Sequence, residues 1–373
     1  MIKLDNVTKA FETAAGTTPA VDHVSFEVNE GEICVLLGPS GCGKTTTLKM
    51  VNRLVQPTSG KIFINGKDTD SYDPVELRRT IGYVIQQIGL FPNMTVEENI
   101  CVVPKLLGWD MTKARKRAAE LLATINLEPA IFLKRYPKEL SGGQQQRVGV
   151  ARALAADPPV LLMDEPFGAI DPINREVIQD EFLKIHRRLK KTVMFVSHDI
   201  DEAVKMADKV AIFRAGKLEQ FDSPDHLLAH PANDFIADFV GTDRTLKRLR
   251  LVKVQSALLP QAARVGPTDR LDLAASLMTE SDQEFIVMVD ELGRPQGYVA
   301  RGLCKGQEGT VAEYGARLPA TVRIDEDLRS AVSKMFMYDV PWLTCVDHDG
   351  VFAGVITQRG VTRLLGETYK TPH

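Results

Sequence analysis

The first thirty residues alternate between apolar and polar side chains. Apolar residues stand at positions 2, 4 and 7, and again at positions 24, 26 and 28. A period of two is typical of strands that bury one face, and antiparallel sheets commonly leave their other face in water. We therefore expect residues 1–30 to form half-buried antiparallel strands.

Three runs further along the chain are apolar without alternation, at residues 33–37, 160–163 and 193–196. Such short continuous runs are typical of strands that are buried on both faces of a parallel sheet. Residues 45–55 have helical spacing, residues 174–189 predict a polar helix, and residues 87–155 favour helix throughout most of their length. This alternation predicts an α/β fold, with a parallel sheet that is covered by helices on both faces.

Past a boundary near Gly241, the chain repeats itself. Nine residues between Leu271 and Gly297 recur between Leu328 and Gly354, each 57 positions later and without an insertion. Each copy predicts an amphipathic helix, an apolar strand, a D-x-x-G turn and a second strand. A long period that occurs only twice favours a pseudo-symmetric pair around one shared core over a solenoid.

These patterns divide the 373 residues into a first domain at 1–240, a linker at 241–255, and two repeat units at 256–310 and 311–373. The linker has five basic residues between positions 244 and 253. These basic residues are consistent with a solvated linker helix. They are also consistent with a segment that contacts anionic lipid headgroups or an acidic partner.

Composition narrows the class of protein. The chain is 44% hydrophobic and 25% charged, as ordinary globular proteins are, and its net charge of −3 argues against nucleic acid as a partner. No apolar run approaches the ~20 residues that cross a bilayer, and the first residues lack the apolar segment of a signal peptide. Five cysteines without C-x-x-C spacing predict reduced thiols in a cytosolic protein.

The stretch GPSGCGKTT follows the first buried run directly. It fits G-x-x-x-x-G-K-[ST], a loop whose backbone N–H groups cradle phosphates. Lys44 is placed to reach the β- and γ-phosphates, and the hydroxyl of Thr45 would bind Mg²⁺. A glycine turn before a helix is the structural alternative. The candidate nucleotide-binding residues are Gly38, Pro39, Ser40, Gly41, Cys42, Gly43, Lys44, Thr45 and Thr46.

A second stretch, VLLMDEP, ends the second buried run with two acidic residues. Asp164 stands where a carboxylate can hold Mg²⁺, directly or through water, and Glu165 is the candidate general base for an attacking water. Such a pair alone also occurs in simple turns. Hydrolysis of a nucleoside triphosphate needs charge stabilisation, a metal and an oriented water, and the two stretches together supply residues for all three.

With LSGGQ at residues 140–144 and a histidine after the third buried run, residues 1 to about 240 resemble the ATPase subunits of ATP-binding cassette (ABC) transporters. The resemblance implies a P-loop NTPase cassette that hydrolyses ATP with Mg²⁺ and has a RecA-like core, an antiparallel β subdomain and a helical subdomain. It also implies that Ser141, Gly142, Gly143 and Gln144 open a helix that receives the γ-phosphate of ATP held by the opposite subunit. Two copies of the chain would then work as a homodimer.

The resemblance assigns further residues one by one. Gln86, in IGYVIQ, matches the glutamine that senses Mg²⁺ and water and contacts the permease, and His198, in VSHD, matches the histidine that contacts the γ-phosphate. Asp171, in GAID, matches an aspartate that crosses the dimer interface, although S-A-L-D is usual there. Phe11, in KAF, matches the aromatic that stacks on adenine, with a core phenylalanine as the alternative. The implied catalytic set is Glu165, His198, Gln86 and Lys44, and the implied metal set is Thr45, Gln86 and Asp164.

Residues 90–99, LFPNMTVEEN, resemble importer ATPases that dock on a permease, so the region from Gln86 to Asn99 is the implied permease contact. The repeated tail resembles a pair of cystathionine-β-synthase (CBS) domains, which are α+β and often bind adenine nucleotides between them. Nucleotide-binding members have an aspartate where this chain has Gly360 and Leu303. A regulatory or dimerising role and a purely structural brace are therefore both consistent with the tail.

A cassette followed by a CBS pair resembles the ATPase subunits of importers for osmoprotectants such as glycine betaine, carnitine and choline. This resemblance implies a peripheral protein at the cytoplasmic face of the bacterial inner membrane. Its direct partners would be permease subunits, its indirect partner a solute-binding protein, and nucleic acid would not be a partner. An importer of another small solute, such as an amino acid or a sugar, is the nearest alternative, and a soluble ABC ATPase that acts on DNA or ribosomes is a more distant one.

Overall fold

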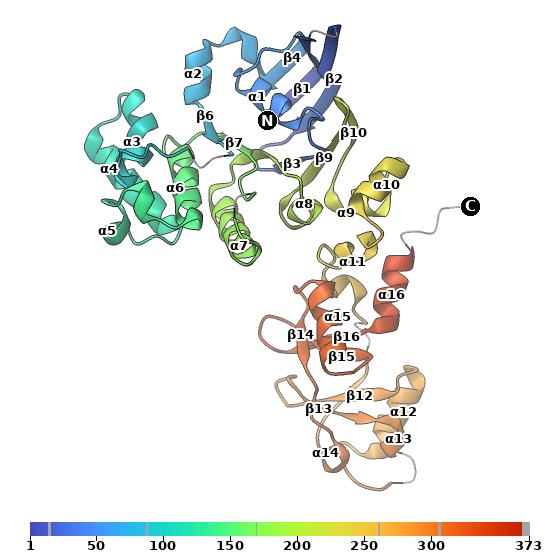
Figure 1. The fold of residues 1–373 in the computed structure, drawn as a ribbon. Helices are drawn as coiled ribbons and strands as arrows, with labels where there is room; N and C mark the ends of the chain where they lie inside the picture. The colour runs from blue at the N-terminus through green and yellow to red at the C-terminus, as the bar shows by residue number, and fades with distance from the viewer. Residues whose placement is uncertain (14–15, 87–88, 169, 260–261, 305–306, 368–373) are drawn as a thin grey trace. The chain divides into compact units, whose positions relative to one another are not determined.

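The chain forms two compact units in a computed structural model that describes residues 1–373 except 14–15, 87–88, 169, 260–261, 305–306 and 368–373 (Figure 1). The first unit comprises residues 1–227 and 231–241, and the second comprises residues 228–230 and 242–373. Each unit has its own clusters of buried apolar side chains, as separately packed domains do. Among the described residues, none of the helices is long and apolar enough to cross a membrane.

The first unit begins with an antiparallel sheet. Its strands are β1 (Ile2–Thr13), β2 (Gly16–Val28), β4 (Ser59–Ile64) and β5 (Lys67–Asp68), in the order β2-β1-β4-β5. The apolar positions 2, 4, 7, 24, 26 and 28 are all buried, because a period of two places them on one face. The predicted antiparallel strands at residues 1–30 are confirmed, and β4 and β5 extend the sheet beyond them.

A second sheet has six strands in the order β10-β9-β3-β8-β7-β6. They are β3 (Ile33–Leu37), β6 (Ile81–Val84), β7 (Val160–Asp164), β8 (Thr192–Val196), β9 (Lys209–Arg214) and β10 (Lys217–Asp222). All pair in parallel except β10, which is antiparallel to β9. Strands β3, β7 and β8 are buried at every residue, so the parallel sheet predicted from the three apolar runs is confirmed.

The register of this sheet makes three strands end together. Leu36 of β3 and Asp164 of β7 both lie opposite Val196 of β8. The segments that follow these strands therefore leave the sheet at one edge, where parallel strands present their carboxyl ends. These segments are the glycine-rich loop, the acidic pair and the turn that contains His198.

The two faces of the six-stranded sheet are covered differently. One face, which includes Leu36, Leu162 and Met194, packs in a single cluster with α1 (Lys44–Val51) and with the antiparallel sheet. The other face includes Phe195, whose ring meets Phe167 edge-on at 6.1 Å between centroids. The predicted helix on the first face is present as α1, and the antiparallel sheet packs there as well, because its apolar side also needs a surface to pack on.

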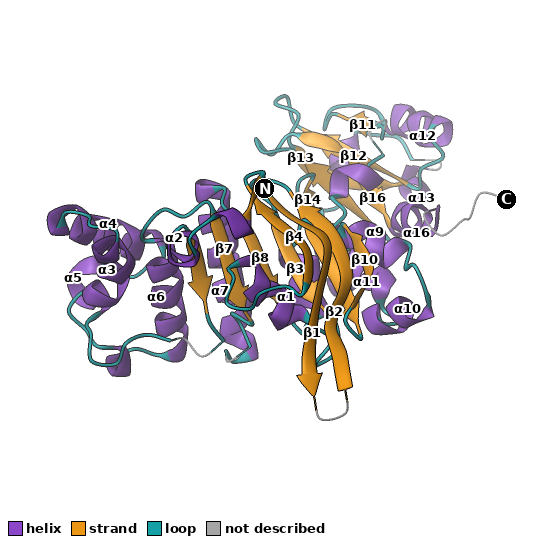
Figure 2. Ribbon diagram, turned by 90° about the horizontal axis from the view of Figure 1, so that it is seen from above, coloured by secondary structure: helices purple, strands orange, loops and turns teal. Residues whose placement is uncertain are grey.

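Helices of the first unit fall into two groups. The first connects or follows the strands and comprises α1, α2 (Pro74–Arg79), α7 (Pro172–Leu189), α8 (Ile200–Met206), α9 (Pro224–Ala229) and α10 (Asp234–Val240). The helices of the second group lie together at the left of Figure 2. They are α3 (Val96–Leu106), α4 (Met111–Thr124), α5 (Pro129–Phe132) and α6 (Gly142–Leu154). Short 3-10 turns occur at Thr69–Ser71 and Pro137–Glu139. The second group is the mostly helical stretch expected within residues 87–155.

The second unit contains one succession of elements twice. The first half has β11 (Arg264–Val265), α12 (Leu271–Glu280), β12 (Phe285–Val289), β13 (Pro295–Ala300) and α13 (Arg301–Cys304). After α14 (Val311–Tyr314), the second half has β14 (Thr321–Arg323), α15 (Leu328–Met337), β15 (Trp342–Val346), β16 (Phe352–Thr357) and α16 (Gln358–Glu367). Each element of the second half begins 57 positions after its counterpart. The predicted helix, strand, turn and strand are confirmed, and a short parallel strand precedes each helix.

Each half of the second unit has a core of its own, and a third apolar cluster joins the halves. In that cluster Phe285 of β12 stacks on Trp342 of β15, with 3.6 Å between ring centroids and 12° between ring planes. Tyr298 meets the same tryptophan edge-on. Phe285 and Trp342 open equivalent strands of the repeat. The sequence predicted one core shared by both repeats. The structure instead has a separate core in each half and an aromatic interface between them.

The basic segment before the repeats is only partly solvated. Its helix α11 (Arg244–Arg248) leads to a 3-10 turn at Val254–Ala257, and Leu249 and Val254 belong to the core of the second half. Arg248 is buried as well. The prediction of a solvated linker helix is wrong for these residues, because apolar side chains between the basic ones pack into the core.

Candidate nucleotide-binding site

The glycine-rich loop joins β3 to α1 and excludes side chains at two of its positions. Gly38 and Gly43 have φ angles of 141° and 105°. A β-carbon at Gly38 would lie 2.2 Å from the carbonyl oxygen of Phe213, and one at Gly43 would lie 2.3 Å from that of Ala20. Only glycine fits there, and the loop then runs directly into the N-terminus of α1, where backbone N–H groups and the helix dipole favour an anion.

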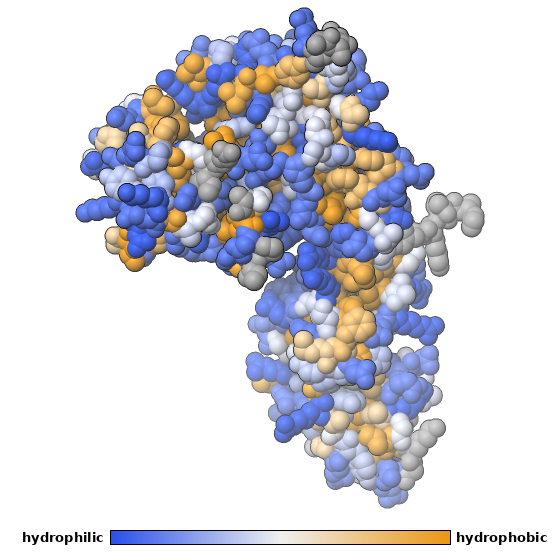
Figure 3. Space-filling model, in the orientation of Figure 1, coloured by the Kyte–Doolittle hydropathy of each residue, from blue (hydrophilic) through white to orange (hydrophobic). Residues whose placement is uncertain are grey.

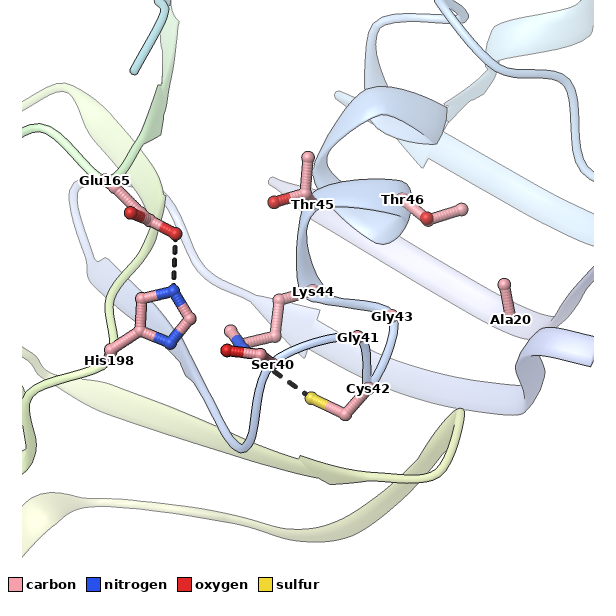
Figure 4. Close-up of a pocket in the computed structure, with 10 residues that line it drawn as sticks. All are labelled: Ala20, Ser40, Gly41, Cys42, Gly43, Lys44, Thr45, Thr46, Glu165 and His198. Atoms are coloured by element: carbon pink, nitrogen blue, oxygen red, sulfur yellow. Dashed lines mark hydrogen bonds and ion pairs between the residues drawn. The ribbon is translucent and has the colours of Figure 1, made fainter. Parts of the chain in front are cut away.

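A cavity of about 250 Å³ lies against this loop (Figure 4). Its walls are Ala20, Ser40, Gly41, Cys42, Gly43, Lys44, Thr45, Thr46, Glu165 and His198. The structure thus brings most of the expected loop residues together with Glu165 and His198. Asp164 does not line the cavity and joins the site through its hydrogen bond with Thr45. Ala20 belongs to β2 and was not expected here, because no motif marks it. Its only signal is the close approach of its backbone to Gly43.

Lys44 is almost fully buried, with 4% of its surface exposed. Its ammonium group donates hydrogen bonds to the carbonyl oxygens of Gly38, at 2.7 Å, and Pro39, at 2.9 Å. The sulfur of Cys42 lies 3.7 Å from the same nitrogen. Gly38 and Pro39 therefore contribute through their carbonyls, which hold the cation inside the loop and beside the cavity. A buried cation at this position suits a polyanionic ligand such as a triphosphate.

Thr45 and Asp164 form a pair of oxygen donors at the floor of the site. The Thr45 hydroxyl donates to Oδ1 of Asp164 at 3.0 Å. Burial raises the pKa of Asp164 above its usual value, and the hydrogen bond from Thr45 and the charge of Lys49 oppose that rise. A buried carboxylate beside a hydroxyl offers the hard oxygen ligands that Mg²⁺ prefers, and a cation there would offset the desolvation. The donor set therefore fits Mg²⁺.

Glu165, which directly follows β7, is held by residues at or just after the ends of β6 and β8, the strands on either side of β7. Its backbone has a φ of 46°, an uncommon conformation for a residue with a side chain, and its N–H donates to the carbonyl of Val196. One carboxylate oxygen, Oε2, accepts from Nε2 of Gln86 at 2.7 Å. The other, Oε1, lies 2.5 Å from Nε2 of His198, and Figure 4 shows this contact facing the cavity. Two residues predicted from separate motifs, Gln86 and His198, thus converge on the carboxylate of a third, Glu165.

Phe11 is not among the described residues that line this cavity. It lies on β1, 43% exposed, with the ammonium of Lys9 at 5.0 Å from its ring centroid. The alternative of a core phenylalanine is therefore wrong. An exposed ring is accessible to a planar ligand, and its role in adenine stacking stays a prediction.

The LSGGQ residues and Asp171 open helices outside the cavity. Ser141 Oγ accepts from the backbone of Gln144, and Gln144 Oε1 accepts from the backbone of Ser141, which makes a reciprocal cap at the start of α6. Gly142 and Gly143 form the first turn of α6, and a β-carbon at Gly143 would meet Ile178 of α7 at 2.9 Å. Asp171 caps α7 by accepting from Asn174. Their roles at a second copy's nucleotide stay predictions.

The segment expected to meet a permease is organised by Asn99. This fully buried side chain accepts from the backbone of Phe91 and donates to the carbonyls of Phe91, Met94 and Thr95. Phe91 itself is exposed and lines a cavity of about 320 Å³ together with Tyr83 and Arg152. Asn99 of α3 therefore has a structural role in holding the preceding loop, and Phe91 and Met94 are exposed apolar side chains of that loop.

In the second unit, the residues that replace a nucleotide-binding motif are used for local structure. Thr357 Oγ1 accepts from the backbone N–H of Gly360 at 3.0 Å, at the start of α16. A β-carbon at Gly360 would lie 3.1 Å from the same hydroxyl. The turn is therefore tight, and it carries no carboxylate at position 360 for a ribose.

Known proteins are similar to this chain in sequence and in fold. The family model for ABC transporters matches residues 21–168. The osmoprotectant import ATP-binding protein OsmV of Salmonella typhimurium is 55% identical over 360 residues, which cover 96% of this chain and 94% of that protein. The glycine betaine/carnitine/choline transport ATP-binding protein OpuCA of Bacillus subtilis is 43% identical, over 98% of this chain and 96% of that protein.

A solved structure covers the first part of the chain. It is the dimeric ATP-binding cassette MJ0796 in a post-hydrolysis state, bound to ADP and Pi, with a TM-score of 0.54 and 37% identity over 60% of this chain and 98% of that chain. The P-loop cassette predicted from the motifs is therefore confirmed as the fold. The family model and the identity along nearly the full length of a curated relative agree with the site geometry. The chain therefore belongs to the ATP-binding proteins of the ABC transporter family.

Proposed function

We propose that this chain hydrolyses ATP as a homodimer to drive the import of quaternary-amine osmoprotectants. The single observation that carries the catalytic part is the position of Glu165, held by Gln86 and His198 beside the phosphate-binding loop. The substrate class is supported by the relatives, whose names refer to osmoprotectants and to glycine betaine, carnitine and choline.

Each residue of the site has a proposed part in hydrolysis. Lys44 and the backbone of the loop bind the β- and γ-phosphates, and Thr45, Gln86 and Asp164 hold Mg²⁺, which neutralises phosphate charge when bound. The Glu165 carboxylate takes a proton from water while the water oxygen attacks the γ-phosphorus. The bond from that phosphorus to the β–γ bridging oxygen breaks, and ADP and inorganic phosphate are formed. His198 orients the carboxylate and contacts the γ-phosphate.

The second half of each site comes from a second copy. The start of α6, with Ser141 to Gln144, and the cap of α7 at Asp171 lie outside the cavity of their own chain. A helix N-terminus with two glycines is suited to bind a phosphate at close range. A dimeric arrangement is recorded for the solved relative MJ0796. In our proposal, α6 of one copy closes the phosphate-binding loop of the other.

The transport partners follow from the same comparison. We propose that the region from Gln86 to Asn99 contacts permease subunits, with Phe91 as its exposed apolar side chain. Gln86 would then connect the permease contact to Glu165, to which it is hydrogen-bonded. The chain would be peripheral at the cytoplasmic face of the bacterial inner membrane and would meet a solute-binding protein only through the permease.

The second unit is proposed to be a CBS pair with a regulatory or dimerising role. The twofold repeat and the stacked interface of Phe285 and Trp342 support a pseudo-symmetric pair. Ordinary adenosine binding is not proposed, because Gly360 stands where a ribose-binding carboxylate would be needed. Deleting residues 242–373, so that no part of the core of the second unit remains, should leave basal hydrolysis intact and change its response to salt. An unchanged salt response would contradict the regulatory role.

The catalytic proposal is tested with Glu165→Gln in the full chain. The amide retains the shape of the side chain but cannot take a proton, so turnover should fall about 10²- to 10⁴-fold while ATP still binds. Light scattering with Mg²⁺ and ATP should then show a stable dimer. Glu27→Gln, at an exposed carboxylate of β2, is the matched control and should hydrolyse ATP normally. Full turnover in Glu165→Gln, or a monomer with ATP bound, would contradict the proposal.

A further inference from the structure

The turn that contains His198 rests on a buried carboxyl group that no motif indicates. Glu202 lies in the first turn of α8, four residues after His198, and only 5% of its surface is exposed. Two side chains donate to it, namely Ser197 to Oε2 at 2.5 Å and Gln179 of α7 to Oε1 at 3.1 Å. Both donors are buried as well. A buried carboxylate is stable only when it is hydrogen-bonded in this way.

Ser197 connects this carboxyl group to the histidine. Its backbone N–H donates to Leu36 of β3, which fixes it at the end of β8, and its hydroxyl accepts from the backbone N–H of Asp199 at 3.0 Å. His198 lies between the two residues that this hydroxyl joins. Because the hydroxyl proton is directed to Glu202, its lone pairs are free to accept from Asp199. Glu202 therefore fixes the hydroxyl that closes the turn around His198.

The same carboxyl group connects the turn to α7, the helix that Asp171 caps. Gln179 bonds to Glu202 from the middle of α7, and Arg175 of the same helix lies 3.8 Å from Asp199 while it donates to the carbonyl of Ile170. Burial raises the pKa of Glu202 despite these donors, because desolvation disfavours the charged form of the carboxyl group. A group that is costly to bury and that has donors from two elements is suited to setting their relative position.

We infer that Glu202 is a positioning residue, which holds His198 in the orientation required for its contact with Glu165 and the γ-phosphate. It touches neither the cavity nor Glu165, and it acts through Ser197. This inference rests on the proposed role of His198 in hydrolysis. Displacement of a catalytic group by about 1 Å can lower a rate about a hundredfold, so a hydrogen bond one residue away is sufficient for a large effect.

The test measures steady-state ATP hydrolysis and ATP affinity in the full chain. Glu202→Ala should lower kcat about tenfold to a hundredfold and leave the Kd for ATP within about twofold, because the phosphate-binding loop is untouched. Glu202→Gln should recover most of kcat, since its amide oxygen still accepts from Ser197. Asp201→Asn, at an exposed carboxylate of the same helix, is the matched control and should leave kcat unchanged. Turnover of Glu202→Gln as low as that of Glu202→Ala would contradict the inference.

A double-mutant cycle separates positioning from general support of the fold. If Glu202 acts only through His198, adding Glu202→Ala to His198→Ala should change kcat by less than about twofold. A further loss as large as in the single variant would overturn the inference. Ser197→Ala gives a second route if Glu202→Ala does not fold, and it should lower kcat as Glu202→Ala does. Full turnover in His198→Ala would refute the proposed function itself, whereas an impaired His198→Ala beside a fully active, folded Glu202→Ala would refute only the positioning role.

Discussion

Two regions of this chain are built where strands from distant parts of the sequence meet, and they gather opposite kinds of side chain. At the edge of the six-stranded sheet, the ends of β3, β7 and β8 bring together polar groups, among them Asp164 and His198. Between the repeats, β12 and β15 meet through Phe285 and Trp342, in a cluster of apolar residues. The first arrangement places charge beside a cavity, and the second excludes it.

The comparison shows that the polar residues of the candidate site and the apolar residues that join the two repeats lie in different regions of the chain. Burial raises the pKa of the Asp164 carboxyl group. Its charged form is therefore stabilised by a bound cation, and it destabilises the fold when no cation is bound. The aromatic stack instead adds packing energy and leaves few polar groups to satisfy. If this contrast is right, substitutions in the first region should alter turnover more than stability, and substitutions in the second should do the reverse.

The largest expected effect is on turnover in Asp164→Asn. The amide retains an acceptor for Thr45 but loses the charge that would hold Mg²⁺, so kcat should fall by about a hundredfold or more. Phosphate release at saturating Mg²⁺ and ATP measures it, with Asp201→Asn as the control. Turnover close to that of the unmodified chain would remove Asp164 from the metal site.

The next largest effect should appear in stability rather than turnover. Trp342→Ala removes one ring of the stack and leaves a cavity between the repeats, which should destabilise the second unit by about 3–5 kcal/mol. Calorimetry should show an earlier transition for that unit, while the Kd for ATP of the first unit stays the same. Phe336→Ala, at a ring that is 73% exposed, should change stability by less than about 0.5 kcal/mol. Equal effects of the two truncations would show that the stack does not stabilise the pair.

A smaller effect should follow from making the interface more symmetric. Thr344 of β15 is fully buried, and its hydroxyl has no hydrogen-bond partner within the described residues. The equivalent position of β12 is Val287, also fully buried. Thr344→Val should therefore stabilise the second unit by about 1–3 kcal/mol, because it removes an unsatisfied buried hydroxyl at constant shape. Urea denaturation measures the change, and a loss of stability would indicate a partner for this hydroxyl.

The smallest effect concerns pH. Burial raises the pKa of Asp164 in the fold above its usual value, so the folded chain binds this proton more tightly than the unfolded chain does. Its contribution therefore destabilises the fold at neutral pH, and this destabilisation fades as the pH falls through the raised pKa. Without Mg²⁺, Asp164→Asn should have the higher Tm at pH 7, and the difference in Tm should shrink on acidification. A difference independent of pH would assign the effect to packing.

The sequence by itself determined the features that depend on neighbouring residues. The phosphate-binding loop and the buried strands that precede Gly38 and end at Asp164 are local patterns, because glycine geometry and continuous apolar runs act over a few positions. The 57-residue period likewise predicted the elements of both repeats. Local chemistry was therefore sufficient to name most of the candidate site.

Only the tertiary structure decided which of these parts meet. Gln86 bonds to Glu165 from 79 positions away, and Glu202 bonds to Gln179 across two helices. The burial of Leu249, the place of Ala20 in the cavity wall and the packing of the antiparallel sheet on one face of the six-stranded sheet had no local signal either. The physical reason is that such contacts depend on strand register and packing between elements, which are set by the whole fold and leave no periodicity in the chain.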